Sequence, residues 1–134
     1  MTSTIVYEGN LRTKAVHVQS QSFIETDAPK DNQGNGERFS PTDLVVTSLG
    51  SCMLTIMGIK ARDLGLDLTG TKIELLKVMK SEPRRIGAVD LIIHFPAGFT
   101  ADEKQKTILK NAAINCPVAK TLHPDIEQNI TFNW

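Results

Sequence analysis

The side chains in this sequence that could carry redox chemistry are those of its two cysteines, Cys52 and Cys116. The thiolate is the reactive form of cysteine, so reactivity depends on whether a position favours negative charge. Cys116 stands directly before Pro117, a residue that suits the first position of a helix. The unpaired N–H groups and the positive dipole of a helix start would lower the pKa of the Cys116 thiol. We therefore expect Cys116 to form a thiolate or to leave readily in thiol exchange.

Cys52 lies in the middle of an expected helix, where the backbone N–H groups already have partners. Its activation therefore has to come from neighbours in the folded protein. Both cysteines can equally be small buried hydrophobic residues, which is a common environment for a free thiol. Their separation of about 64 residues does not decide between these alternatives, because disulfide pairing cannot be deduced from spacing.

Metal and nucleotide sites have weaker support. The histidines His17, His94 and His123 could in principle join the cysteines around zinc, but no Cys-x-x-Cys spacing is present and the first two fall in strand patterns. The stretch from Gly34 to Gly36 lacks the preceding strand, the following helix and the lysine of a phosphate-binding loop. We expect neither a metal nor an organic cofactor.

Length and charge narrow the classes of partner. The chain has 134 residues, which suits one domain over residues 1–134. Lysine and arginine total 15, and so do aspartate and glutamate, so the formal net charge is zero. Such a chain has no overall field to attract nucleic acid or anionic lipid. Polar residues interrupt the longest apolar tract, residues 44–59, which indicates a buried amphipathic helix rather than a membrane span.

The first eight residues lack the basic start and the apolar stretch of a secretory signal peptide. We therefore expect a cytoplasmic protein in a reducing compartment. In such a compartment the two cysteines are not expected to form a permanent disulfide. We expect them to be either redox-active thiols or buried apolar groups.

The elements that must position the cysteines are strands around two main helices. Ser40, Pro41 and Asp43 have the spacing of a capping box with proline at the first helical position, which predicts a helix that ends before Gly65. A second helix is expected to start at a cap on Thr100, and a short third helix follows Cys116. The other expected elements are a hairpin of strands 5–7 and 15–19, a loop over residues 27–38, a hairpin of strands 71–82 and 86–95, and a last strand over residues 126–132.

This order of elements predicts an α+β protein with antiparallel sheets rather than a parallel doubly wound sheet. Two segments then resemble a known family. The segment from Phe39 to Met53, which reads FSPTDLVVTSLGSCM, resembles the central-helix signature of the OsmC/Ohr family, and the segment NCPVAKTL from Asn115 to Leu122 resembles its second signature. The resemblance spans essentially the whole chain and is nearest to an OsmC-like subgroup. It implies antiparallel sheets packed on a long central helix, in an intertwined homodimer.

The resemblance also implies a function. Family members reduce organic hydroperoxides, and some accept hydrogen peroxide, with a dithiol or lipoyl-bearing reductant as the electron donor. By this resemblance Cys52 is the peroxidatic residue and Cys116 the resolving one. The alternative is a non-enzymatic dimeric stress-response domain with the same fold.

An arginine from the first hairpin activates the peroxidatic cysteine in this family, and Arg12 stands at the matching position. Arg38, in the loop before the central helix, is a second candidate, and either arginine can instead be a solvated surface charge. One position departs from the pattern of hydroperoxide-resistance enzymes, which place a glutamate directly after the helix-starting proline. Here that residue is Thr42, and Asp43 lies about 100° further round the helix, so we expect Asp43 to act as a cap.

Several apolar residues near Cys52 have two possible roles. They can line a pocket for an apolar peroxide, or they can be ordinary core residues. The residues concerned are Phe39, Leu49, Met53 and Met57.

Overall fold

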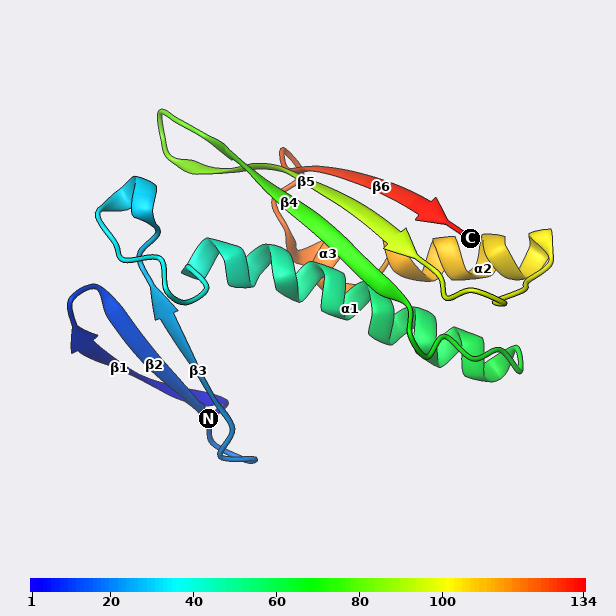
Figure 1. Ribbon diagram of the computed structural model, residues 1–134, viewed down its shortest axis with the longest axis horizontal. Helices are drawn as coiled ribbons and strands as arrows, with labels where there is room; N and C mark the ends of the chain where they lie inside the picture. The colour runs from blue at the N-terminus through cyan, green and yellow to red at the C-terminus, as the bar shows by residue number, and fades with distance from the viewer. The chain divides into compact units, whose positions relative to one another are not determined.

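The computed structural model describes all residues, 1–134, and the chain divides into two compact units (Figure 1). The first unit covers Met1–Val45 and the second covers Val46–Trp134. The expectation of one domain over residues 1–134 stays a prediction.

The first unit is a three-stranded antiparallel sheet in the order β1-β2-β3. Its strands are β1 (Ser3–Gly9), β2 (Arg12–His17) and β3 (Phe23–Asp27). Gly9 and the two residues after it have positive φ angles, which is the backbone conformation of a tight hairpin turn. The predicted first hairpin is therefore confirmed. The third strand was not expected, because its five residues are too few to show a clear alternation of apolar and polar side chains.

The predicted loop follows β3 and contains one short 3-10 turn, η1 (Lys30–Asn32). Its two ends are tied together, because the backbone N–H of Asp27 donates to the carbonyl of Phe39 over 3.1 Å. The backbone N–H of Gly36 also donates to the carbonyl of Ala28. The loop is therefore closed on itself by hydrogen bonds of its own backbone.

The long helix α1 (Pro41–Asp63) begins as the sequence predicts. The Ser40 hydroxyl accepts from the backbone N–H of Asp43, and the Asp43 carboxylate accepts from the backbone N–H of Ser40. These two bonds form a reciprocal capping box and confirm the capping role of Asp43. Gly65 follows the last turn with a φ of 69°, a conformation that glycine adopts without strain.

The second unit contains another three-stranded sheet in the order β4-β5-β6. Its strands are β4 (Lys72–Lys80), β5 (Arg85–His94) and β6 (Glu127–Asn133). The predicted hairpin of β4 and β5 is antiparallel, but β5 and β6 are parallel, so the expectation of purely antiparallel sheets is wrong for this last pair. The physical reason is that a long helical crossover joins β5 to β6, and a crossover returns the chain in the same direction.

That crossover contains α2 (Glu103–Ile114) and α3 (Pro117–Thr121). The cap of α2 is Asp102 rather than Thr100. The Asp102 carboxylate accepts from the backbone N–H of Gln105, and the Gln105 side chain accepts from the backbone N–H of Asp102. Aspartate at this position also suits the positive end of the helix dipole, which explains why the helix starts two residues later than expected.

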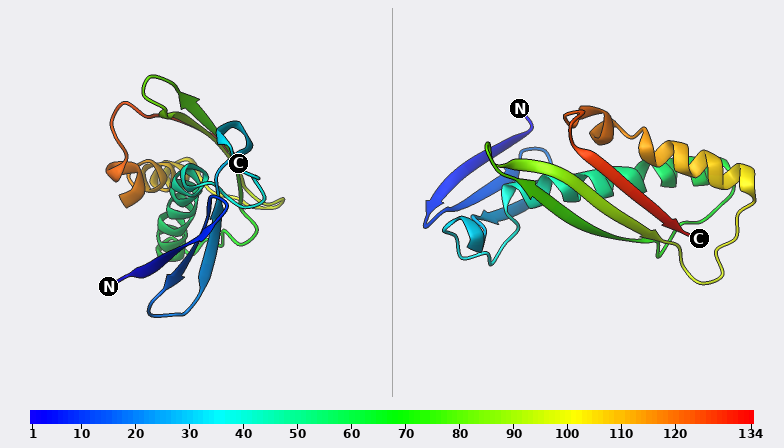
Figure 2. Two further views of the ribbon diagram at one scale, coloured as in Figure 1. Left: turned by 90° about the vertical axis from the view of Figure 1, so that its left-hand side faces the viewer. Right: turned by 90° about the horizontal axis from the view of Figure 1, so that it is seen from above.

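The core of the second unit lies between its sheet and its helices, and Figure 2 shows α1 and α2 side by side on one face of that sheet. The close approach of α1 to the sheet occurs at Gly50, where an added Cβ would lie 3.3 Å from the Leu75 side chain. Buried apolar side chains from both layers fill this space. The largest of them are Leu49, Met53, Met57, Leu91, Ile93 and Leu109.

The helix α1 is long and apolar enough to cross a membrane by length and composition alone. Its side chains Leu49, Met53 and Met57 are instead fully buried against the sheet of the second unit. This is the arrangement of a core helix. The expected α+β architecture, with sheets and a long central helix, is therefore confirmed.

Candidate functional site

The two cysteines meet between α1 and α3, although they are far apart in the sequence. Both are free thiols, and the Cys116 side chain forms a hydrogen bond with Cys52. Cys116 is the N-cap residue of α3 and is completely buried, whereas Cys52 is partly exposed on α1. The two sulfur atoms therefore share one small region, and solvent reaches it on the Cys52 side.

The pKa of Cys116 is raised above its ordinary value, which corrects the expectation of a lowered one. Burial is the largest cause, because it penalises the charged thiolate, and the hydrogen bond with Cys52 raises the pKa further. The backbone N–H groups of Ala119 and Val118 act in the expected direction but do not outweigh burial. The helix they begin is only five residues long. The raised pKa keeps Cys116 a protonated thiol beside Cys52.

An apolar groove begins one helical turn from Cys52 along α1. Ile56 follows Cys52 by one helical turn, and Lys60 follows Ile56 by another, so the three residues share one face of the helix. The groove has a volume of about 450 Å³. Its lining residues come from α1, from α2 and from the C-cap of α2: Ile56, Lys60, Ile108, Asn111, Ala112 and Asn115.

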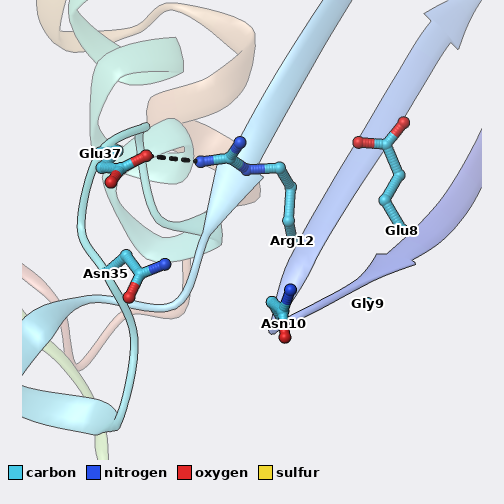
Figure 3. Close-up of a pocket in the computed structure, with 6 residues that line it drawn as sticks. All are labelled: Glu8, Gly9, Asn10, Arg12, Asn35 and Glu37. Carbon is cyan, nitrogen blue, oxygen red and sulfur yellow. Dashed lines mark hydrogen bonds and ion pairs between the residues drawn. The ribbon is translucent and has the colours of Figure 1, made fainter.

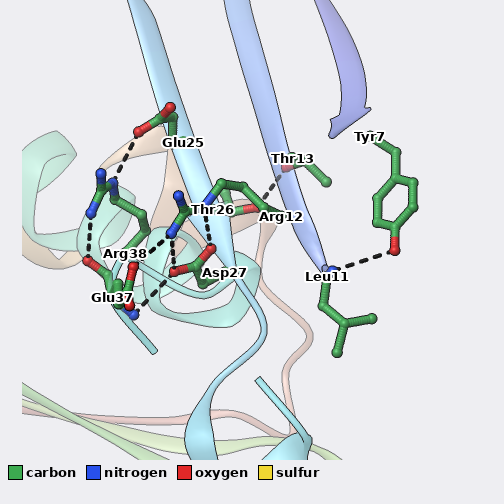
Figure 4. Close-up of polar contacts among 9 residues, drawn as sticks. All are labelled: Tyr7, Leu11, Arg12, Thr13, Glu25, Thr26, Asp27, Glu37 and Arg38. Carbon is green, nitrogen blue, oxygen red and sulfur yellow. Dashed lines mark hydrogen bonds and ion pairs between the residues drawn. The ribbon is translucent and has the colours of Figure 1, made fainter. Parts of the chain in front are cut away.

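Arg12 lies in the first unit, where two carboxylates hold its guanidinium group (Figure 4). Its Nε donates to Oδ1 of Asp27 over 2.7 Å, and its Nη2 donates to Oδ2 over 2.9 Å. The same Nη2 donates to Glu37 over 3.1 Å. The pKa of Asp27 is lowered, mainly by its hydrogen bond with Arg12, so this carboxylate stays ionised.

A polar pocket of about 270 Å³ opens beside Arg12 in the first unit (Figure 3). The first-hairpin turn forms one side, with Glu8 and Asn10, and the loop forms the other, with Asn35 and Glu37. Arg12 and Cys52 belong to different units, and their pairing stays a prediction.

The second candidate arginine, Arg38, donates from Nε to Glu25 over 2.9 Å and also bonds the backbone carbonyl of Glu37. It is half exposed. The hydroxyl of Thr42 bonds the hydroxyl of Ser40 at 3.1 Å, so Thr42 takes part in the start of α1.

The other residues singled out in the sequence have mostly structural positions. Leu49, Met53 and Met57 are core residues, while Phe39 is exposed. No group of three or more His, Cys, Asp or Glu side chains in the structure could hold a metal ion. His94, for example, lies 3.2 Å from a carboxylate oxygen of Glu74.

Sequence reasoning missed Asp27 and Glu37. Asp27 pairs with Arg12 across neighbouring strands, and that register is visible only once β3 is recognised. Opposite charges directly across an antiparallel pair of strands stabilise the pair. The charges of Arg12 and Asp27 could therefore have indicated their pairing, but only if the strand that contains Asp27 had been predicted.

Comparison with known proteins agrees with this arrangement. The sequence model of the OsmC-like protein family matches residues 34–131. No curated protein matches the sequence.

Solved structures give the same result. A protein from Psychrobacter arcticus 273-4, assigned to the osmotic stress and detoxification response, is 53% identical over 99% of this chain and 96% of its own, with a TM-score of 0.95. Two more distant proteins share the fold. The organic hydroperoxide resistance protein OsmC from Legionella pneumophila has 13% identity over 100% of this chain and 98% of its own, with a TM-score of 0.77. The organic hydroperoxide resistance protein OhrB from Bacillus subtilis has 16% identity over 99% and 98%, with a TM-score of 0.69.

Both signature segments, the paired cysteines and the match over most of the chain point the same way. The chain belongs to the OsmC-like protein family.

Proposed function

We propose that the protein is a thiol-dependent peroxidase that reduces organic hydroperoxides, with Cys52 as the peroxidatic residue and Cys116 as the resolving residue. The observation that carries the proposal is the pairing of a fully buried Cys116 with a partly exposed Cys52, whose side chains are in contact. Cys52 is also the cysteine that a substrate from solvent can reach.

The chemistry needs no group beyond the two thiols and an external reductant. The Cys52 thiolate attacks one oxygen of the hydroperoxide, the O–O bond breaks, and the alkoxide leaves and takes up a proton as the alcohol. Cys52 is then a sulfenic acid. The Cys116 thiol attacks its sulfur, releases water and forms a disulfide. A dithiol or lipoyl-type reductant reduces this disulfide by exchange and becomes a disulfide itself.

Two further parts of the proposal concern activation and substrate. Arg12 is the proposed cation beside the Cys52 thiolate, because a guanidinium group favours the charged form of a sulfur. The groove that begins one turn from Cys52 offers apolar side chains, Ile56 and Ile108, to the organic part of a hydroperoxide. The names of the relatives from Legionella pneumophila and Bacillus subtilis, which refer to organic hydroperoxide resistance, support this substrate class.

We also propose a cytoplasmic homodimer. The first unit exposes several large apolar side chains, including Ile5, Tyr7 and Phe23, each of them more than half exposed. Exposed apolar patches of this kind mark interaction surfaces, and most soluble oligomers are symmetric homo-oligomers. A second copy of the chain is the simplest partner to cover that surface.

A non-enzymatic stress-response domain is the second candidate. It is favoured by Thr42, which stands where hydroperoxide-resistance enzymes have glutamate, and by an Arg12 already paired with two carboxylates. Turnover separates the two candidates. With cumene hydroperoxide and a dithiol, the wild-type protein should consume peroxide catalytically, whereas Cys52→Ser should not. Equal consumption by both proteins would exclude Cys52 as the peroxidatic residue, and no consumption by the wild type would favour the second candidate.

A further inference from the structure

Asp27 fixes the orientation of the Arg12 guanidinium group. Its two carboxylate oxygens accept from Nε and Nη2 of Arg12 at 2.7 and 2.9 Å, which is a bidentate pair. The second oxygen also accepts from the backbone N–H of Glu37 over 3.0 Å. Asp27 itself is only 3% exposed. A buried carboxylate with three donors leaves the guanidinium plane little freedom to rotate.

The hydrogen bonds of Arg12 leave one of its nitrogens open. A guanidinium group has five N–H bonds: one on Nε and two on each terminal nitrogen. The Nε bond is directed at Asp27, and Nη2 serves both Asp27 and Glu37. Nη1 makes no hydrogen bond in the structure. The Arg12 guanidinium group is therefore held along its Nε–Nη2 edge, and the two N–H groups of Nη1 can donate to an anionic atom of another residue.

The charged groups around Arg12 differ in how firmly they hold it. Glu37 offers a single bond and is 62% exposed, so water competes for it. Glu8 lines the same pocket without an ion pair to Arg12. The neighbouring ion pair of Arg38 and Glu25 is separate. Asp27 is therefore the one buried anchor of the guanidinium group.

We propose that Asp27 is a positioning residue, which fixes the orientation of the Arg12 guanidinium group for its proposed role in activating Cys52. This inference rests on the proposed pairing of Arg12 with Cys52. Asp27 on strand β3 then orients the arginine. Glu37 has a separate role, because it links the loop to the same guanidinium group.

The test measures the reactivity of the Cys52 thiolate, which does not depend on peroxidase turnover. In a Cys116→Ser background, the rate of alkylation of Cys52 by iodoacetamide is followed as a function of pH, and its midpoint reports the formation of the thiolate. Removal of an oriented cation should raise this midpoint by about one pH unit or more. We expect this shift for Arg12→Ala and for Asp27→Asn, and no further shift when the two are combined.

A variant that keeps the positive charge separates position from charge. Arg12→Lys can still pair with Asp27, so the fold of the first unit should survive, but lysine lacks the second oriented nitrogen. We expect its midpoint to match that of Arg12→Ala. A wild-type midpoint for Arg12→Lys would overturn the inference, and this outcome can be read even if Asp27→Asn fails to fold.

Two matched controls use carboxylates of the same unit. Glu25→Gln breaks the ion pair with Arg38 on the same strand and should leave the midpoint unchanged. Glu37→Gln leaves the bidentate pair intact and removes one negative charge near Arg12, so it should lower the midpoint slightly. A rise with Glu37→Gln as large as that with Asp27→Asn would overturn the assignment to Asp27.

The failure of the inference can be told from the failure of the proposed function. If Cys52→Ser abolishes peroxide consumption but Asp27→Asn and Arg12→Lys keep the wild-type alkylation midpoint, the peroxidase proposal stands and the positioning proposal is wrong. If these variants shift the midpoint while Cys52→Ser still consumes peroxide, Asp27 positions Arg12 and the peroxidase assignment is wrong.

Discussion

A hydrogen bond between the side chains of Cys116 and Cys52 joins the N-cap residue of α3 to the middle of α1. The two thiols are thus neighbours in the reduced protein. Burial and this hydrogen bond both keep Cys116 protonated, while Cys52 faces solvent. Because one thiol is buried and the other is partly exposed, we expect substitutions of the two cysteines to have different effects.

Substitution of Cys116 should leave a protein that reacts once. In Cys116→Ser, Cys52 can still attack a peroxide, but no thiol is present to form the disulfide, so the sulfenic acid should persist. We expect a single stoichiometric burst of peroxide consumption and a mass increase of one oxygen atom on the peptide that contains Cys52. The wild-type protein under the same conditions should show an intramolecular disulfide instead. Undiminished turnover by Cys116→Ser with a dithiol would rule out its resolving role.

The reduced protein should lose stability at high pH because of Cys116. Its folded pKa lies above the value of 9.0 expected for the unfolded chain, so the folded state holds this proton more tightly. The contribution of this group to the free energy of unfolding is therefore complete below about pH 9.0 and declines as the pH rises through the folded pKa. Urea unfolding in the presence of a phosphine reductant measures this decline.

The matched control for this measurement is Cys116→Ala, which lacks the titrating thiol. Other groups ionise in the same range, so the informative quantity is the difference between the two slopes of unfolding free energy against pH. We expect the wild type to have the steeper decline. Parallel slopes would contradict the raised pKa.

The start of α2 can be tested by two single substitutions. Asp102 forms both bonds of the capping box with Gln105, so Asp102→Ala should reduce the free energy of unfolding by about 0.5–2 kcal/mol. Thr100→Ala should have little effect, because Thr100 lies outside the capping box. Chemical denaturation of the two variants checks this. A larger loss with Thr100→Ala would place the cap where the sequence first suggested it.

Core packing provides a comparison between two leucines on the paired strands β4 and β5. Leu91 is 1% exposed and lies in the core of the second unit, so Leu91→Ala should cost about 2–5 kcal/mol of unfolding free energy. Leu76 is 62% exposed, so Leu76→Ala should cost less than about 1 kcal/mol. Denaturant titrations of both variants measure the difference. Equal losses would mean that Leu76 is covered by another chain in solution.

Local signals in the sequence were sufficient for most elements. The capping box at Ser40 and the glycine at position 65 fixed the ends of α1, because caps depend on residues within one helical turn. The turn after Gly9 fixed the first hairpin for the same reason. The parallel pairing of β6 was not predictable in this way, since it depends on where the crossover through α2 and α3 returns the chain.

The site shows the same division. The positions of Cys52 and Cys116 on their helices followed from local patterns and from two signature segments. The sign of the Cys116 pKa shift did not, because burial depends on residues distant in the sequence and here outweighs the local N–H groups. The partners of Arg12 were missed because they come from β3 and the following loop.

The crossover between β5 and β6 has a mechanical consequence for the second cysteine. Cys116 belongs to a connection whose two ends are fixed to adjacent strands of one sheet. Cys116 is also fully buried in the core of the second unit, so its travel during a redox cycle is limited by the side chains packed around it. We expect opening and closing of a Cys52–Cys116 bond to be absorbed by small adjustments of the five residues of α3, while the sheet beneath stays in register.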